Sequence, residues 1–213
     1  MKQQERTQKT KERILAAAIE EFGTKSYESA SVNAICNESQ IPKGLLYHNF
    51  KNKDALYLQC VKICFDQMTA FLSAQSFDMQ DIPSSLEKML ALRQDFFAKH
   101  PHYANIFFNS VLQPPKHLLP ALREIRREFD AFNTQCYRNM VEHLPLRDGI
   151  TEETALEYFS IFQELFNEIF QRKVEQGRDY HALISEHEGK LSTILDIMLY
   201  GIAKQSPTDR NKP

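Results

Sequence analysis

The most informative part of the sequence, residues 31–53, reads SVNAICNESQIPKGLLYHNFKNK. Ser31 is a favourable N-cap for a short helix that contains Val32 and Ile35. Pro42 suits the first position of a second short helix, because its φ is already helical and its missing N–H would have no partner there. The stretch therefore predicts two short helices joined by a tight turn, which is the arrangement of a helix-turn-helix.

The segment before this stretch predicts a longer helix that braces the two short ones. Its apolar residues recur at the spacing of one helix face, and Gly23 stands where such a helix usually ends. Helices of about seven residues are not stable alone, since nucleation costs too much for so few hydrogen bonds. We therefore expect the three helices, followed by a fourth from about Lys53, to share one small core. Its predicted members are Ile14, Ala18, Phe22, Val32, Ile35, Ile41, Leu46 and Phe50.

The composition is that of an ordinary globular protein. Hydrophobic residues make up 42% and charged residues 25% of the 213 residues, which excludes a disordered chain, a collagen-like fibre and a disulfide scaffold. With only 6 Gly and 9 Pro, long helices are favoured over a strand-rich fold. No apolar run approaches the roughly 20 residues of a membrane span, and the polar N-terminus does not resemble a signal peptide. We expect a soluble, cytoplasmic protein whose four cysteines are reduced thiols.

Charge is distributed unevenly along the chain. Residues 1–53 contain nine Lys and Arg against six Asp and Glu, a balance of +3, whereas the whole chain has a net charge of −2. The remainder therefore carries −5. A basic N-terminal part followed by an acidic one indicates two functions in one chain.

The sequence from Arg13 to Lys53 resembles the N-terminal DNA-binding domain of the TetR family of bacterial transcriptional regulators. Three positions depart from the family pattern, which commonly has Ala, Ala and Gly where Cys36, Ser39 and Gln40 stand here. A left-handed turn conformation at Gln40 would cost roughly 1–2 kcal/mol relative to Gly. The matching residues are Ile14, Leu15, Ala17, Ala18, Phe22, Tyr27, Ser31, Val32 and Ile35, and above all the string IPKGLLYHNFKNK at residues 41–53.

The resemblance implies an all-α fold with two domains. Residues 1–53 would form a three-helix helix-turn-helix DNA-binding domain. Residues 54–204 would form a larger helical domain that binds an effector and dimerises, and residues 205–213 a disordered tail.

The second short helix is the predicted recognition helix, whose N-terminal residues would lie near base edges in the major groove. Lys43 would donate to guanine or to a phosphate, and Gly44 would either allow close approach to DNA or relieve crowding between helices. By the resemblance, Tyr47 and Lys53 contact phosphates. The basic residues Lys2, Arg6, Lys9, Lys11 and Arg13 form either a frayed tail or an arm that adds DNA contacts. The predicted DNA-contacting residues are Ser31, Pro42, Lys43, Gly44, Leu45, Tyr47, His48, Asn49 and Lys53.

Beyond residue 75, prolines and glycines divide the chain into five predicted helices, at 83–100, 102–112, 120–143, 151–176 and 180–204. The last two carry apolar residues over more than half of their circumference, which indicates contact on two sides. In the family, two such helices pair across a two-fold axis. A helix-turn-helix that reads one half-site also calls for a symmetric partner. We therefore expect a homodimer formed through these two C-terminal helices.

Phenylalanine and methionine are abundant in the body of the chain, and most are expected to be core. The resemblance implies that a subset lines an effector cavity, and an aromatic, Met-lined cavity would suit an apolar or flat ligand. Polar residues that could orient the ligand are Arg93, Asn105, Asn109, Gln135, Tyr137, Gln163 and Asn167. The predicted pocket residues are Phe65, Met68, Phe96, Phe107, Phe108, Phe132, Met140, Phe162 and Phe166.

Motifs of enzymes are missing from the sequence. It contains no Gly-rich phosphate loop, zinc-hydrolase motif or nucleophile elbow, and we predict no enzymatic activity, cofactor or metal site. Cys60 and Cys64, four residues apart, are expected to be buried core thiols rather than metal ligands or oxidant sensors.

The expected function is that of a homodimeric repressor released from a palindromic operator by a small apolar or aromatic effector. Two alternatives remain: control by a protein partner or by oxidation of Cys60 and Cys64, and a helical enzyme or adaptor whose head only resembles the motif.

Overall fold

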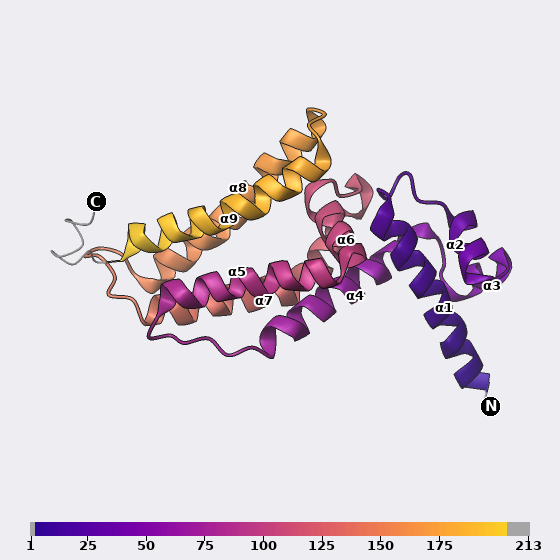
Figure 1. Ribbon diagram of the computed structural model, residues 1–213, viewed down its shortest axis with the longest axis horizontal. Coiled ribbons are helices and arrows are strands. Elements are labelled where there is room, and N and C mark those ends of the chain that lie inside the picture. The colour runs from indigo at the N-terminus through magenta and orange to yellow at the C-terminus, as the bar shows by residue number, and fades with distance from the viewer. Residues whose placement is uncertain (1–2, 204–213) are drawn as a thin grey trace. The chain divides into compact units, whose positions relative to one another are not determined.

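The computed structural model describes residues 3–203, and its regular structure within them is helical (Figure 1). The predicted all-α fold is thus confirmed, while Lys2 and the predicted tail at 205–213 lie outside the described residues. The helices are α1 (Gln3–Thr24), α2 (Val32–Ser39), α3 (Lys43–Asn49), α4 (Lys53–Ser73), α5 (Ile82–Lys99), α6 (Pro101–Leu112), the short 3-10 helix η1 (Lys116–Leu118), α7 (Leu119–Glu142), α8 (Glu152–Glu175) and α9 (Tyr180–Ile202).

Local signals set most helix ends close to the predicted positions. Pro101 is the first residue of α6, where its missing N–H costs nothing. Thr151 caps α8 by accepting from the Thr154 N–H at 3.1 Å, and the Asp179 carboxylate caps α9. Gly177, with φ of 77°, supplies the left-handed residue between them.

The basic N-terminal residues, expected to form either a frayed tail or an arm, are helical in the described part of the chain. The helix begins at Gln3 and continues through Gly23 to Thr24, so Gly23 does not end it. Arg6, Lys9, Lys11 and Arg13 therefore lie on a regular helix (Figure 1).

The chain forms two compact units that are interleaved in sequence. Unit 1 consists of Met1–Phe71 and Asp95–Glu128, and unit 2 of Leu72–Gln94 and Phe129–Pro213. Helices α4, α5 and α7 each contribute residues to both units, because each unit boundary falls inside a helix.

The core of unit 1 contains the small three-helix core expected from the sequence, with Val32 half-buried instead of buried. Helix α6 packs against the C-terminal part of α1, where the Asn105 amide donates to the Gly23 carbonyl at 2.7 Å. Aromatic rings on α4, α5 and α6 contact one another in the same unit. The buried members of the predicted core are Ile14, Ala18, Phe22, Ile35, Ile41, Leu46 and Phe50.

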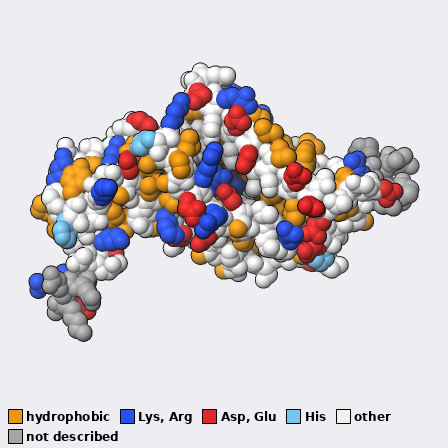
Figure 2. Space-filling model, turned by 180° about the vertical axis from the view of Figure 1, so that it is seen from behind, with side chains coloured by type: hydrophobic (Ala, Val, Ile, Leu, Met, Phe, Trp, Pro, Cys, Tyr) orange, Lys and Arg blue, Asp and Glu red, His pale blue; other side chains and the backbone are white. Residues whose placement is uncertain are grey.

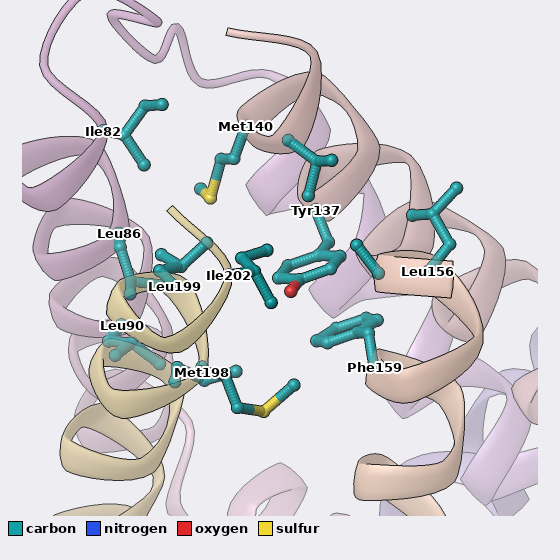
Figure 3. Packing of buried hydrophobic residues seen from close by; sticks show 13 residues of the cluster. Ile82, Leu86, Leu90, Tyr137, Met140, Leu156, Phe159, Met198, Leu199 and Ile202 are labelled. Atoms are coloured by element: carbon teal, nitrogen blue, oxygen red, sulfur yellow. The ribbon is translucent and has the colours of Figure 1, made fainter. Parts of the chain in front are cut away.

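The core of unit 2 is an apolar cluster drawn from α5, α7, α8 and α9 (Figure 3). The Tyr137 and Phe159 rings stack at its centre, 4.1 Å apart and nearly parallel. The cluster consists of Ile82, Leu86, Leu90, Tyr137, Met140, Val141, Ala155, Leu156, Phe159, Leu195, Met198, Leu199 and Ile202.

Candidate nucleic-acid interface

Helices α2 and α3 form the predicted helix-turn-helix, at the outer side of α1 (Figure 1). Ser31 caps α2 by accepting from the Ala34 N–H. Gln40 ends it in the left-handed region, with φ 52° and ψ 40°, and its N–H donates to the Asn37 carbonyl. The turn therefore has the usual left-handed helix ending despite the unfavourable residue.

Helix α3 presents all but one side of its surface to solvent. Leu46 is fully buried and anchors the helix in the core of unit 1. Lys43 and Gly44 in its first turn are exposed, as are Leu45 at 41% and Tyr47 at 42%. A short helix held at one point and open elsewhere has the geometry needed to enter a major groove.

The predicted contact residues differ in how much of their side chain is available. Pro42 and His48 are exposed. The half-buried Asn49 donates from its side chain to the Leu45 carbonyl at 2.8 Å. The hydroxyl of the half-buried Ser31 serves as the α2 cap.

Lys53, at the start of α4, is held close to the motif. Its ammonium lies 4.5 Å from the centre of the Tyr27 ring and donates to the Glu28 carbonyl at 3.4 Å. The Tyr27 hydroxyl in turn donates to the Asp54 carboxylate, and this hydrogen bond is the main reason that the pKa of Asp54 is lowered. Lys53 is thus positioned by its neighbours rather than free in solvent.

Two residues tie the motif to α1: Arg13, which the sequence suggested only as part of a tail or an arm, and Glu21, which it did not single out. The Arg13 guanidinium donates to the Ser39 carbonyl at 2.7 Å, at the end of α2. The Glu21 carboxylate accepts from the Ser31 backbone N–H at 2.7 Å, at its start. Both contacts join residues ten or more positions apart, so no local pattern indicates them.

The residues of the predicted effector pocket fall into two groups, one in each unit. In unit 1 the five residues are buried, and the Phe107 ring lies 5.0 Å from Phe65 and 5.3 Å from Phe108. In unit 2, Met140 belongs to the apolar cluster. The ring centres of Phe162 and Phe166 lie 5.4 Å apart, and Phe132 is half-buried.

An open hollow of about 800 Å³ lies on the surface of unit 2, apart from the predicted pocket residues. One of the residues that line it, Leu156, also belongs to the apolar cluster. The lining residues are Arg138, Thr151, Glu152, Glu153, Leu156, Glu157 and Ser160.

Unit 2 also contains a buried polar network that the sequence did not predict. The Arg93 guanidinium donates to the Glu188 carboxylate at 2.9 Å, and the same oxygen lies 3.0 Å from Nδ1 of the buried His187. Nε2 of His187 lies 3.3 Å from the Asn167 side-chain oxygen. Burial lowers the pKa of His187. Burial also opposes ionisation of Glu188, but Arg93 and His187 together lower its pKa.

Metal-binding groups and membrane-spanning helices are absent from residues 3–203. There, no three His, Cys, Asp or Glu side chains are grouped as metal ligands would be. Within the same range, no helix combines the length and hydropathy needed to cross a bilayer.

Comparison with known proteins finds a family match in the N-terminal part of the chain. Residues 14–60 match the family described as "Bacterial regulatory proteins, tetR family". The chain is 47% identical over 53 residues to the HTH-type transcriptional regulator UidR of Escherichia coli (strain K12), a match that covers 25% of this chain and 27% of UidR. It is 36% identical over 58 residues to IcaR of Staphylococcus aureus (strain Newman), the HTH-type negative transcriptional regulator of the biofilm operon icaADBC, covering 27% of this chain and 31% of IcaR. The matched stretch thus spans less than a third of either regulator.

The fold resembles known structures over nearly the whole chain. The regulator FadR from Bacillus subtilis, solved in complex with stearoyl-CoA, has a TM-score of 0.59 and 18% identity, covering 89% of this chain and 98% of that one. This likeness concerns the fold. The family match at residues 14–60 shows that this helix-turn-helix region is of the kind found in the tetR family of bacterial regulatory proteins.

Proposed function

We propose that the chain is a homodimeric transcriptional repressor that binds a palindromic operator and is released from it by a small apolar or aromatic effector. The observation that carries the proposal is the exposure of α3 around a single buried anchor. Its anchor Leu46 is buried, while the groove-facing candidates Lys43, Leu45 and Tyr47 are exposed. The printed description of IcaR as a negative regulator supports repression as the outcome.

Selection from random duplex DNA tests the first part of this proposal. We expect the purified protein to enrich an inverted repeat whose half-sites lie about 34–36 Å apart, one helical turn. Affinity for that repeat should fall steeply with salt, since phosphate contacts release counterions. Recovery of no motif, with only weak and salt-sensitive binding, would contradict the proposed sequence-specific function.

The double variant Lys43→Ala/Tyr47→Ala should bind the selected operator at least about 30-fold more weakly, because each lost groove or phosphate contact costs about 1–3 kcal/mol. Both side chains are exposed, so thermal unfolding should stay close to that of the wild type. The matched control is Lys62→Ala, which removes an exposed lysine of α4 paired with Asp66. Unchanged operator affinity in the double variant would exclude α3 as the reading helix.

The proposed dimer rests on the outward faces of α8 and α9. Four large apolar residues of α8 are about half exposed at helical spacing, namely Tyr158, Ile161, Leu165 and Ile169. On α9, Ile197 and Tyr200 are even more exposed. Figure 2 shows hydrophobic side chains gathered along this pair of helices. A continuous exposed apolar stripe is typical of a surface that a partner covers, and a second copy satisfies the symmetry of a palindromic operator.

Leu165→Lys should convert the protein to a monomer in sedimentation experiments and weaken operator binding in parallel. The side chain is half exposed in one copy, so the substitution should leave the monomer folded but would bury an unpaired charge in a dimer. Glu164→Lys adds the same side chain at the next exposed position and should remain dimeric. A Leu165→Lys protein that sediments as a dimer would rule out this stripe as the interface.

Control by an effector is favoured over control by thiol oxidation. Cys60 and Cys64 are fully buried, and burial raises the pKa of both thiols, which disfavours the reactive thiolate. The Cys64 thiol also donates to the Tyr103 carbonyl at 3.2 Å. Oxidant-dependent operator binding that disappears in the Cys60→Ser/Cys64→Ser variant would reverse this preference.

A further inference from the structure

The Tyr137 side chain, on α7, ends in a hydroxyl with no hydrogen-bond partner among the described residues. Only 4% of the residue is exposed. Figure 3 shows the ring stacked on Phe159 and the oxygen pointing inward, toward Ile202 of α9. Buried hydroxyls in folded proteins nearly always have a partner, and one without a partner calls for an explanation.

The state of this hydroxyl identifies what is missing. Burial raises the pKa of Tyr137 to about 12, so the group is a protonated donor at neutral pH. The side chains around it in the cluster are apolar and offer no acceptor. The missing partner is therefore a hydrogen-bond acceptor.

The surroundings of Tyr137 suit a ligand that is otherwise apolar. Met140 and Met198 belong to the cluster, and Met79 and Met89 pack against it. Methionine side chains are unbranched and adapt to irregular shapes, so this core is able to repack around an added molecule. The cluster also joins α5 and α7 to α8 and α9, the last two being the proposed dimer helices.

The charges that line the neighbouring hollow disfavour an anionic ligand. Leu156 belongs both to the cluster and to the lining of the open hollow on unit 2, which also includes three carboxylates and one guanidinium. That guanidinium, on Arg138, is already paired with Glu152 at 2.6 Å. In the hollow an anion would thus meet three carboxylates and a guanidinium that is already paired, and burying an unpaired anion in the apolar cluster is costly.

We propose that the apolar cluster between α5, α7, α8 and α9 opens to bind a neutral, apolar molecule with one hydrogen-bond acceptor, which accepts from the Tyr137 hydroxyl. The proposal deepens the effector role proposed above and rests on it for the consequence at the operator. Binding itself is measurable without DNA.

Three naphthalenes of nearly equal shape test the proposal on the full chain. 2-Acetylnaphthalene is neutral and carries a carbonyl acceptor, 2-isopropenylnaphthalene has a methylene in place of that oxygen, and 2-naphthoate is an anion. In protein labelled with ¹³C at the methionine methyls, we expect the ketone to move the NMR signals of Met140 and Met198 but not that of Met68 in unit 1. The ketone should bind about tenfold more tightly than the alkene, and the anion should not bind at these methyls.

Tyr137→Phe should abolish the tenfold preference for the ketone while leaving the affinity for the alkene unchanged. The variant should also be at least as stable as the wild type, because it removes a hydroxyl without a partner. Tyr27→Phe, the same change at a hydroxyl bonded to Asp54, should lower stability and leave the preference intact.

Several outcomes would overturn the site. One is equal affinity for ketone and alkene in the wild type, and another is a preference that survives in Tyr137→Phe. A loss of stability in that variant, or Met140 and Met198 signals that do not shift when the ketone is added, would also overturn it. A ketone that binds as expected but leaves the protein on its selected operator would keep the site and overturn only its role as the effector site. Failure to select any operator would leave the binding result standing by itself.

Discussion

Arg93→Met is expected to lower the free energy of unfolding by about 3–5 kcal/mol, because it leaves the buried Glu188 carboxylate without its ion-pair partner. The Arg93 and Glu188 side chains are only 13% and 14% exposed and lie 2.9 Å apart. Glu188 also contacts the buried His187. Without the guanidinium, the carboxylate would have to stay ionised in an apolar setting or take up a proton.

A double-mutant cycle separates two contributions to the lost stability: the loss of the ion pair, and the cost of a buried carboxylate left without its partner. Arg93→Met/Glu188→Met should recover much of the stability lost in Arg93→Met, since a buried pair replaced by apolar side chains is often nearly neutral. The matched control is Arg138→Met in the same unit. It breaks an Arg–Glu pair whose side chains are both 41% exposed, so its cost should stay below about 1 kcal/mol. Equal losses in Arg93→Met and Arg138→Met would contradict the argument from burial.

The pH dependence of stability provides a second measurement on the same variant. In the wild type, the pKa of Glu188 is lowered, so its contribution is present above the carboxyl's unfolded pKa and is lost as pH falls through the folded value. In Arg93→Met, burial acts without the opposing guanidinium and raises the pKa of Glu188. The variant should therefore lose less stability than the wild type on acidification, as measured by urea unfolding across acidic pH values. A parallel loss in both proteins would contradict the assigned role of Arg93.

Gly23→Leu is expected to destabilise unit 1 by about 3 kcal/mol or more, the upper end of the usual cost of overpacking. A Cβ at this position would lie 2.5 Å from Cβ and 2.7 Å from Cα of His102. The close approach belongs to the contact between α1 and α6, which is also held by the hydrogen bond from Asn105 to the Gly23 carbonyl. Since the Cα of His102 is backbone, only separation of the two helices would relieve the clash.

Thermal unfolding of matched glycine variants checks this prediction. Gly44→Leu introduces the same side chain where no atom lies within 4 Å, so stability should change by less than about 1 kcal/mol. His102→Ala should not rescue Gly23→Leu, because the Cα and Cβ of residue 102 remain in place. A stable Gly23→Leu protein, or rescue by His102→Ala, would show that the contact is not as close as the structure has it.

Local residue patterns were sufficient to predict the helix-turn-helix. The Ser31 cap and the inward-facing Leu46 depend on neighbours within a few residues, whereas Pro42 stands at the N-cap of α3, one residue before the predicted first position. The left-handed Gln40, predicted as a cost of the turn, is present with φ of 52°. Periodicity could not locate the start of α1, because polar residues before Ile14 carry no apolar stripe, yet α1 begins at Gln3.

The sequence by itself therefore determined that this protein is all-helical, where most of its helices end, and where the two short helices of the helix-turn-helix lie. Only the tertiary structure decided that α6 packs on Gly23, that Arg93 pairs with Glu188 across 95 positions, and that the Tyr137 hydroxyl is buried with no acceptor among the described residues. The physical reason is the sequence separation between the residues that set each feature. Caps, turns and amphipathic stripes are properties of adjacent residues, whereas the partner of a buried polar group is set by the packing of helices that are distant in the chain.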